Sequence, residues 1–197
     1  MLFGKRRDEG RFLIIGLGNP GKKYRNTRHN VGFMALDYLS EVYGIRVTRS
    51  RFSSLAGEGK IGEVKVVLVK PMTFMNLSGQ AVAAVSSYYK VPPERIIVIC
   101  DDINLSPGVI RIRDHGSSGG QRGLLSIEDM LESKDYIRVR IGVGDRASGE
   151  LSSHVLSSPD AADNKAITER FPDIAQAVEL ILTNRLTEAQ SLYNGSI

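Results

Sequence analysis

Cysteine and histidine, the residues that most often hold metals or cross-link small folds, are scarce in this chain. Its 197 residues include one cysteine, Cys100, which excludes an internal disulfide and a cysteine-rich zinc site. The three histidines have no H-E-x-x-H spacing, so the sequence carries no metal signature. We therefore expect a cytoplasmic protein in a reducing environment, with neither a metal nor a cofactor.

Long apolar runs are also absent. No run approaches the roughly 18 residues that span a bilayer, and residues 1–11 lack the apolar core of a secretory signal. Hydrophobic residues make up 42% of the chain and charged residues 24%, which is typical of a globular protein that does not enter a membrane. Without repeats or linkers, we expect one domain over 1–197, with 1–10 as a flexible N-terminal extension. The sequence does not fix the oligomeric state, and we expect a monomer.

The charges are unevenly distributed along the chain. Residues 1–100 carry 16 Lys/Arg and 7 Asp/Glu, a balance of +9, whereas residues 101–197 carry 10 and 15, a balance of −5. Such asymmetry is typical of a protein with one face that meets a polyanion. A basic face that is simply solvated is an equally good interpretation of charge alone.

Apolar runs and turn residues predict strands that alternate with helices. We expect strands near 11–16, 96–100, 109–113 and 136–143, and a hairpin over 52–70 that turns near 59–62. We expect helices over about 30–43, 78–90, a short one ending near 131, and two at 159–170 and 173–193, separated by Phe171-Pro172. This order predicts a single α/β domain with a mixed, twisted β-sheet flanked by helices.

His29 lies at a junction where chemistry is more common than packing. The first strand ends at the glycine-rich turn GLGNPG, residues 16–21, and the first helix is expected to begin after Asn30, a good N-cap. His29 is thus close to free backbone N–H groups and to the positive end of a helix dipole. Taken alone, such a histidine is more often a surface or capping residue, so its neighbours must decide.

Three polar side chains follow apolar runs at the ends of predicted strands. Asn19 follows the first strand, Asn76 the second arm of the hairpin, and Asp101 the run 96–100. Because sites in open α/β sheets form outside the carboxyl ends of strands, we expect these residues to converge with His29. A histidine base, a supporting carboxylate and two amides can activate and orient a water molecule.

Other catalytic classes fit the sequence less well. No serine lies in a G-x-S-x-G turn, and Cys100 lies within an apolar run, where a core role is expected. The turn at 16–21 matches the dinucleotide-binding pattern G-x-G-x-x-G. However, no helix opens on the third glycine, and the acidic residues at the right distance, Asp37 and Glu41, fall within the predicted helix.

Several blocks of the sequence resemble bacterial-type peptidyl-tRNA hydrolases, in order and in spacing. They are GLGNPG at 16–21, TRHNVG at 27–32, KPMTFMNLSG at 70–79, DD at 101–102 with PG at 107–108, RVRIGVG at 138–144 and HVL at 154–156. The resemblance covers nearly the whole chain. It implies hydrolysis of the ester bond between a peptide, or an N-blocked amino acid, and the terminal ribose of tRNA, which recycles tRNA from stalled translation.

The resemblance also implies roles for the four candidate site residues. His29 would be the general base and Asp101 the carboxylate that stabilises it. Asn19 would recognise the blocked peptidyl end, and Asn76 would position the substrate and its carbonyl group. An ester has a better leaving group than an amide, so an activated water and a few polar donors suffice without metal.

A second group of residues is expected to contact the tRNA. Tyr24 and Phe74 would line the surface that meets the tRNA end. Arg140 alternates with Arg138 along a predicted strand, so either could be a solvated edge charge or a phosphate contact. In all, we expect the tRNA-binding residues to be Tyr24, Phe74, Asn76, Arg113, Arg122 and Arg140, with peptidyl-tRNA as the partner.

The glycine-rich loop departs from the family pattern. Relatives usually have His-Asn-Gly where this chain has Gln121-Arg122-Gly123. Arginine offers only donors and a fixed charge, so Arg122 could grip a phosphate or spoil a contact that needed an acceptor. Two alternatives therefore stay open: a non-catalytic RNA-binding relative, similar to intron-splicing factors, and a different hydrolase on the same fold, such as an aminopeptidase-like enzyme.

Overall fold

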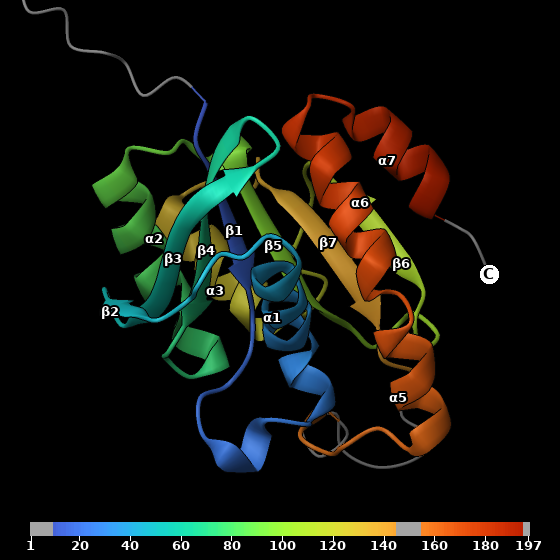
Figure 1. Ribbon diagram of the computed structural model, residues 1–197. Coiled ribbons are helices and arrows are strands. Elements are labelled where there is room, and N and C mark those ends of the chain that lie inside the picture. The colour runs from blue at the N-terminus through green and yellow to red at the C-terminus, as the bar shows by residue number, and fades with distance from the viewer. Residues whose placement is uncertain (1–9, 145–154, 195–197) are drawn as a thin grey trace, which may run out of the picture.

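The fold is centred on one twisted sheet (Figure 1). The computed structural model describes residues 10–144 and 155–194, so the expected extension at 1–10 lies, apart from Gly10, outside the described residues. Within these ranges seven strands pair in the order β2-β3-β4-β1-β5-β7-β6. They are β1 (Phe12–Gly16), β2 (Arg49–Arg51), β3 (Ser54–Ile61), β4 (Val64–Pro71), β5 (Ile96–Asp102), β6 (Ile110–Arg113) and β7 (Ile137–Gly142).

The sheet is mixed, which confirms the predicted fold class. The neighbouring strands β4, β1, β5 and β7 run parallel to one another. The hairpin β3–β4 is antiparallel, as is the pairing of β6 with β7 at the far edge. The arrowheads of β1 and β7 point to the lower edge of the sheet in Figure 1, where the loops after the parallel strands gather.

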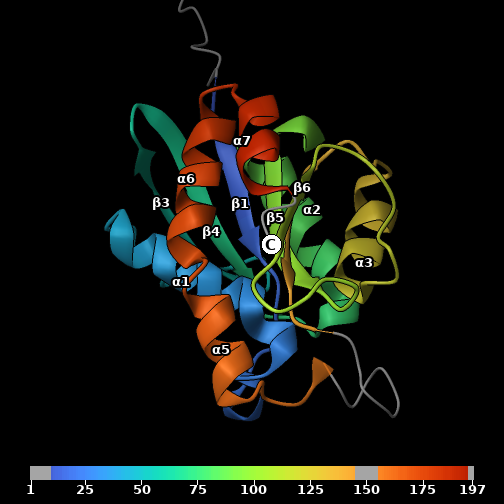
Figure 2. The ribbon, with the colours of Figure 1, turned by 90° about the vertical axis from the view of Figure 1, so that its right-hand side faces the viewer.

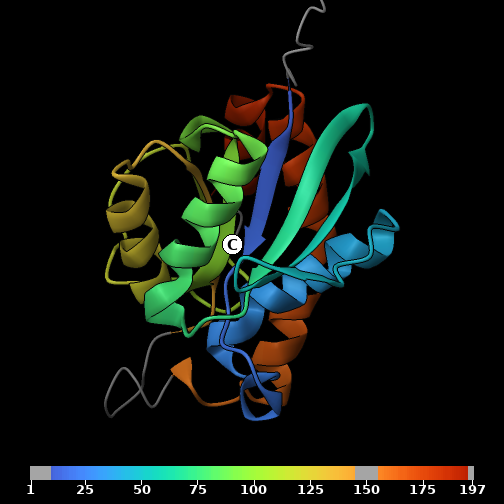
Figure 3. The same cartoon turned by 90° about the vertical axis from the view of Figure 1, so that its left-hand side faces the viewer.

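Helices cover both faces of the sheet and form a three-layered molecule (Figures 2 and 3). On one face lie α1 (Val31–Val42), α6 (Phe171–Leu182) and α7 (Leu186–Tyr193), and on the other lie α2 (Ser78–Tyr89) and α3 (Arg122–Leu131). A further helix, α5 (Ala161–Thr168), precedes α6. None of the helices in the described ranges combines the length and the apolarity needed to cross a membrane.

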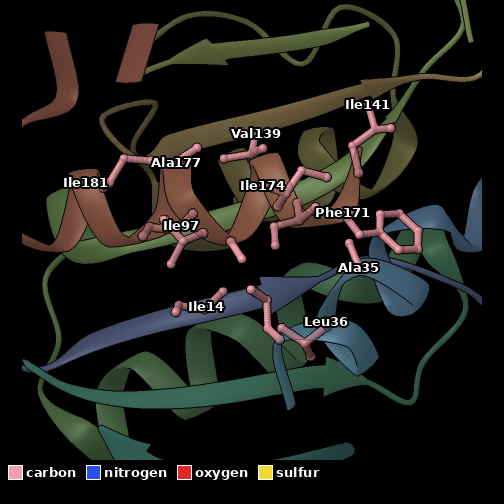
Figure 4. Close-up of a cluster of buried hydrophobic side chains, with 14 of the residues drawn as sticks. Ile14, Ala35, Leu36, Ile97, Val139, Ile141, Phe171, Ile174, Ala177 and Ile181 are labelled. Carbon is pink, nitrogen blue, oxygen red and sulfur yellow. The ribbon is translucent and has the colours of Figure 1, made fainter. Parts of the chain in front are cut away.

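Successive side chains along β1 and β5 point to opposite faces of the sheet, and they contribute to a separate hydrophobic core on each face. Ile14 and Ile97 point toward α1 and α6, whereas Leu13 and Ile15 pack against α2 and α3. Figure 4 shows part of the first core, where Phe171 of α6 lies beside Ala35 of α1, and where Ile14 and Ile97 of the sheet belong to the same cluster. Burying each such side chain stabilises the fold by about 1.5–3 kcal/mol, and it fixes the strand ends that carry the site.

Gly32 allows α1 to begin directly against the sheet. A Cβ atom at this position would lie 2.4 Å from the carbonyl oxygen of Ile99 and 2.6 Å from the backbone nitrogen of Leu17. Because both neighbours are backbone atoms of the central strands and their exits, no larger residue fits without moving them. The close approach brings the turn before α1, with His29, to the carboxyl end of β5.

The C-terminal helices differ from the sequence prediction. Three helices stand where two were expected, and Phe171-Pro172 begins α6 instead of separating two helices. Proline is tolerated there because the first turn of a helix leaves its N–H groups without partners in any case. The sequence prediction missed the interruption at Asn184, which separates α6 from α7. The backbone of Asn184 is left-handed, with a φ of 60°, so the helix cannot continue through it.

Arg138 is a second departure from the prediction. Its side chain is 1% exposed and pairs with Glu128 of α3 at 3.3 Å, because α3 covers that face of β7. It also donates hydrogen bonds to the carbonyl oxygens of Tyr136 (2.9 Å) and Gly116 (2.5 Å). Arg138 is therefore neither a solvated edge charge nor a phosphate contact; it anchors the start of the glycine-rich loop.

Candidate active site

A cavity of about 440 Å³ opens at the carboxyl end of the sheet, and most predicted site residues line it. Asn19 lies in the loop that follows β1, Asp101 is near the end of β5, and His29 lies in the 3₁₀ turn Arg28–Asn30 before α1. The remaining predicted residues in its wall are Tyr24, Phe74, Asn76, Arg122 and Arg140. Arg113 is the exception: it lies exposed at the end of β6 and is not part of the lining.

His29 and Asp101 form the central pair of the cavity. The Nδ1 atom of His29 lies 2.8 Å from Oδ2 of Asp101, and the side chains are 11% and 2% exposed. A carboxylate can only accept, so Nδ1 of the neutral ring carries the proton and donates it. Nε2 then keeps its lone pair and is the atom that can take a proton from water.

The second oxygen of Asp101 is also occupied. Nε2 of Gln121 donates to Oδ1 of Asp101 at 2.9 Å, while Oε1 of Gln121 accepts from the backbone N–H of Leu124 at 2.8 Å. Gln121 is thus the N-cap of α3 as well as a partner of the site carboxylate. In the sequence, Gln121 stands out only as a departure from the family pattern; its position just before a helix could have identified the cap, but not the contact with Asp101.

Hydrogen bonds fix the side chain of Asn19 in the wall of the cavity and leave its amide nitrogen available as a donor. Its Oδ1 atom accepts from the backbone N–H of Met75 at 2.8 Å, which leaves Nδ2 as the outward donor. Asn30 fixes the backbone of Asn19 from both sides, because Oδ1 of Asn30 accepts from the Asn19 N–H and Nδ2 donates to the Asn19 carbonyl. Asn30 precedes α1 as predicted, but it makes no side-chain cap there, since its amide is used for Asn19.

The rim of the cavity carries exposed polar and aromatic side chains. Asn76 lies exposed in the 3₁₀ turn Met75–Leu77 that follows β4, and Phe74 just before it is 57% exposed. Tyr24, from the 3₁₀ turn Lys22–Tyr24, is half-buried and also lines the cavity. The exposed ring of Phe74 and the partly exposed ring of Tyr24 offer flat faces on which nucleotide bases can stack.

Two arginines border the cavity in different states. Arg122 is exposed at the first position of α3, with its charge available to a ligand. Arg140 is largely buried: Nη1 donates to Oδ2 of Asp102 at 3.2 Å and Nη2 to the carbonyl oxygen of Ser117 at 2.8 Å. Asp102 therefore neutralises Arg140, which also holds the glycine-rich loop in place.

Arg28 ties the histidine turn to a distant part of the chain. It donates from Nε to the carbonyl oxygen of Val143 at 3.2 Å and from Nη1 to Oγ of Ser157 at 2.8 Å, and it pairs with Asp163 of α5 at 3.2 Å. The neighbouring residues Val155 and Leu156 line the cavity, whereas His154 lies outside the described residues. No sequence pattern predicted this role, because its partners are more than a hundred residues away.

The structure also bears on the other catalytic classes. Cys100 is fully buried, and burial raises the pKa of its thiol far above its usual range, so it is a core residue, as expected. In the part of the chain that the structure describes, no group of three or more His, Cys, Asp or Glu side chains could hold a metal ion. The glycine turn leads into the 3₁₀ turn Lys22–Tyr24 and not into α1, unlike a dinucleotide-binding loop.

Comparison with known proteins agrees with the geometry. The family model described as peptidyl-tRNA hydrolase matches residues 13–197. The peptidyl-tRNA hydrolase of Caldanaerobacter subterraneus is 50% identical over 184 residues, which are 93% of this chain and 100% of the relative. That of Clostridium novyi is 43% identical over 93% of this chain and 98% of the relative.

Solved structures give the same result. The crystal structure of peptidyl-tRNA hydrolase from Acinetobacter baumannii superposes with a TM-score of 0.90 at 35% identity, covering 93% of this chain and 94% of the other. The family model covers residues 13–197, and the two relatives and the Acinetobacter structure each cover 93% of this chain. The chain therefore belongs to the peptidyl-tRNA hydrolase family.

Proposed function

We propose that this protein hydrolyses the ester bond between a peptide, or an N-blocked amino acid, and the terminal ribose of tRNA, with His29 as the general base. One observation carries the proposal: the buried, hydrogen-bonded pair of His29 and Asp101 at 2.8 Å, inside a cavity lined by Asn19 and Asn76. Membership of the peptidyl-tRNA hydrolase family, which spans 13–197, supplies the substrate class.

The reaction needs one activated water molecule. Nε2 of His29 removes a proton as the water oxygen attacks the ester carbonyl carbon, and the carboxylate of Asp101 stabilises the imidazolium that forms. When the tetrahedral intermediate collapses, the bond from the carbonyl carbon to the ribose oxygen breaks, and the imidazolium returns its proton to that oxygen. The products are a peptide with a free carboxyl group, which keeps the second proton of the water until it ionises in solvent, and a tRNA with a free hydroxyl group.

The two amides orient the peptide part. Nδ2 of Asn19 points outward because Met75 occupies Oδ1, so it suits an acceptor such as a carbonyl oxygen of the blocked peptidyl end. Asn76, an exposed residue in the wall of the cavity, positions the reacting carbonyl group and can donate to the oxygen that becomes negative. A free amino group is charged and cannot serve as the expected acceptor, which favours N-blocked substrates.

The tRNA part is held by the rim. Tyr24 and Phe74 offer rings for the terminal bases, and Arg122 offers an exposed guanidinium for a phosphate. Arg140 is already paired with Asp102, so a phosphate would compete with that carboxylate for it, whereas Arg113 would act outside the cavity, on more distant phosphates. We further propose that the protein works as a monomer in the cytoplasm, in keeping with its single buried cysteine.

The test is a cleavage assay on N-acetylated and free aminoacyl-tRNA, with and without a chelator. We expect cleavage of the N-acetylated substrate only, unaffected by the chelator, and its loss in His29→Ala. The matched control is His115→Ala, because the side chain of His115 is 75% exposed and outside the cavity. Turnover by His29→Ala at the wild-type rate would refute the mechanism. If the wild-type protein bound N-acetylated aminoacyl-tRNA but did not cleave it, the RNA-binding alternative would be favoured.

A further inference from the structure

We infer that Gln121 is a positioning residue that fixes the orientation of the Asp101 carboxylate toward His29; this inference rests on the proposed function. Gln121 touches the carboxylate and not the ring. Its Nε2 atom lies 2.9 Å from Oδ1 of Asp101, while Oδ2 lies 2.8 Å from Nδ1 of His29. With both oxygens engaged by separate donors, the carboxylate has one preferred rotation about its terminal bond.

The amide of Gln121 cannot turn over without losing two interactions. Its oxygen accepts from the backbone N–H of Leu124, and its nitrogen lies 3.4 Å from the sulfur of Met75 in addition to Asp101. A flipped amide would point its NH₂ group at the Leu124 N–H and its oxygen at the Asp101 carboxylate. Each mismatch leaves a buried or half-buried polar group without a partner, so the donor is directed at Asp101.

The backbone around Gln121 is anchored as well. Its own N–H donates to the carbonyl oxygen of Ser118 at 3.2 Å, and Leu125 of α3 donates to the carbonyl oxygen of Gln121 at 3.0 Å. Below the loop, Arg138 and Arg140 bind the carbonyl oxygens of Gly116 and Ser117. The position of α3 and of the loop is thereby transmitted through one glutamine to the carboxylate that supports the base.

Gln121→Glu separates this role from helix capping. Glutamate has the same length and keeps an oxygen to accept from Leu124, but it loses the donor to Asp101 and adds a second negative charge beside it. The matched control is Gln80→Glu, the same chemical change in the first turn of α2, at an exposed residue outside the cavity. Both variants are compared with the wild type in thermal stability, in pH–rate profiles and in the NMR titration of the His29 ring.

For Gln121→Glu we expect kcat to fall about 10- to 100-fold at neutral pH with little change in KM, because a charge-assisted hydrogen bond to the supporting carboxylate is lost. The added carboxylate stabilises the imidazolium, so the acid limb and the His29 titration should both move to higher pH. Gln80→Glu should leave all of these unchanged. Wild-type kcat and an unmoved His29 titration in Gln121→Glu would reduce Gln121 to a helix cap and overturn the inference.

Failure of the proposed function and failure of the positioning role of Gln121 give different experimental results. If the wild-type protein does not cleave N-acetylated aminoacyl-tRNA, the proposed function fails. The His29 titration needs no substrate, so it still tests whether Gln121 acts on the pair of His29 and Asp101. A shift in Gln121→Glu alone would support the positioning role, and equal titrations in both variants and the wild type would refute it.

Discussion

The substitution Asp101→Asn should remove more activity than the loss of one charge suggests, because Gln121 decides which way the new amide faces. Asparagine fills the space of Asp101 but has one donor end and one acceptor end. Nε2 of Gln121 needs an acceptor at 2.9 Å, so the asparagine oxygen should face Gln121. Its NH₂ group then faces Nδ1 of His29 and takes the lone pair of that nitrogen. The ring is left with its proton on Nε2, where it cannot act as a base.

The size of the effect follows from two contributions. Turning the asparagine to restore the productive ring sets two NH₂ groups against each other, which leaves a donor unsatisfied and costs about 1–3 kcal/mol. Loss of the carboxylate beside a 2.8 Å charge-assisted hydrogen bond costs about a further 1.5–3 kcal/mol when the imidazolium forms. Together these amount to about 2.5–6 kcal/mol, or a loss of kcat of about 10²- to 10⁴-fold.

The assay is single-turnover cleavage of N-acetylated aminoacyl-tRNA by Asp101→Asn, alone and combined with Gln121→Glu. In the double variant the glutamate accepts, so the asparagine turns its NH₂ group to Glu and its oxygen to Nδ1 of His29. The correct ring form returns, and the double variant should be about tenfold faster than Asp101→Asn alone. A loss of less than fivefold in the single variant, or a double variant slower than the single one, would refute the reasoning.

Three further expectations concern the binding surface and the stability of the fold. Arg122→Asn should weaken tRNA binding and flatten its dependence on salt concentration, because one phosphate contact is lost; equal slopes in both proteins would remove Arg122 from the contact set. Glu128→Ala should lower the free energy of unfolding in urea by about 3–5 kcal/mol, because Arg138 keeps a buried charge without its carboxylate, and an unchanged midpoint would mean that backbone carbonyls alone hold it. Burial raises the pKa of the Cys100 thiol, so only the unfolded chain ionises it above about pH 8.5 and stability falls as pH rises further. Cys100→Ala should remove about 2 kcal/mol of that loss between pH 8 and pH 10, and identical pH dependence in both proteins would contradict this account.

The convergence of the site residues could be predicted from the sequence because it depends on topology. Asn19, Asn76 and Asp101 each follow a run that reads as a strand, and parallel strands bring their carboxyl ends to one edge. The roles assigned to these residues and to His29 stay predictions until the variants are measured. The mixed sheet was foreseeable as well, since a hairpin beside alternating strands and helices leaves few other arrangements.

The remaining features depend on tertiary contacts that no local pattern encodes. The alternation around Arg138 suggested one solvated face, but α3 covers that face and supplies Glu128. The break at Asn184 lies within a run compatible with one long helix, and the docking of α7 on the sheet decides against it. Gln121 reads as an ordinary loop glutamine until the fold brings Asp101 within reach of its amide.

The contacts of Arg28 determine when, during synthesis of the chain, the turn that carries His29 can reach its final packing. The residue beside His29 is fastened to acceptors that lie 115 to 135 residues further along the chain, so the histidine turn is secured only after Asp163 has been made. The turn that carries His29 therefore gains its last contacts late in synthesis, after the chain as far as α5 has been made and can fold against it.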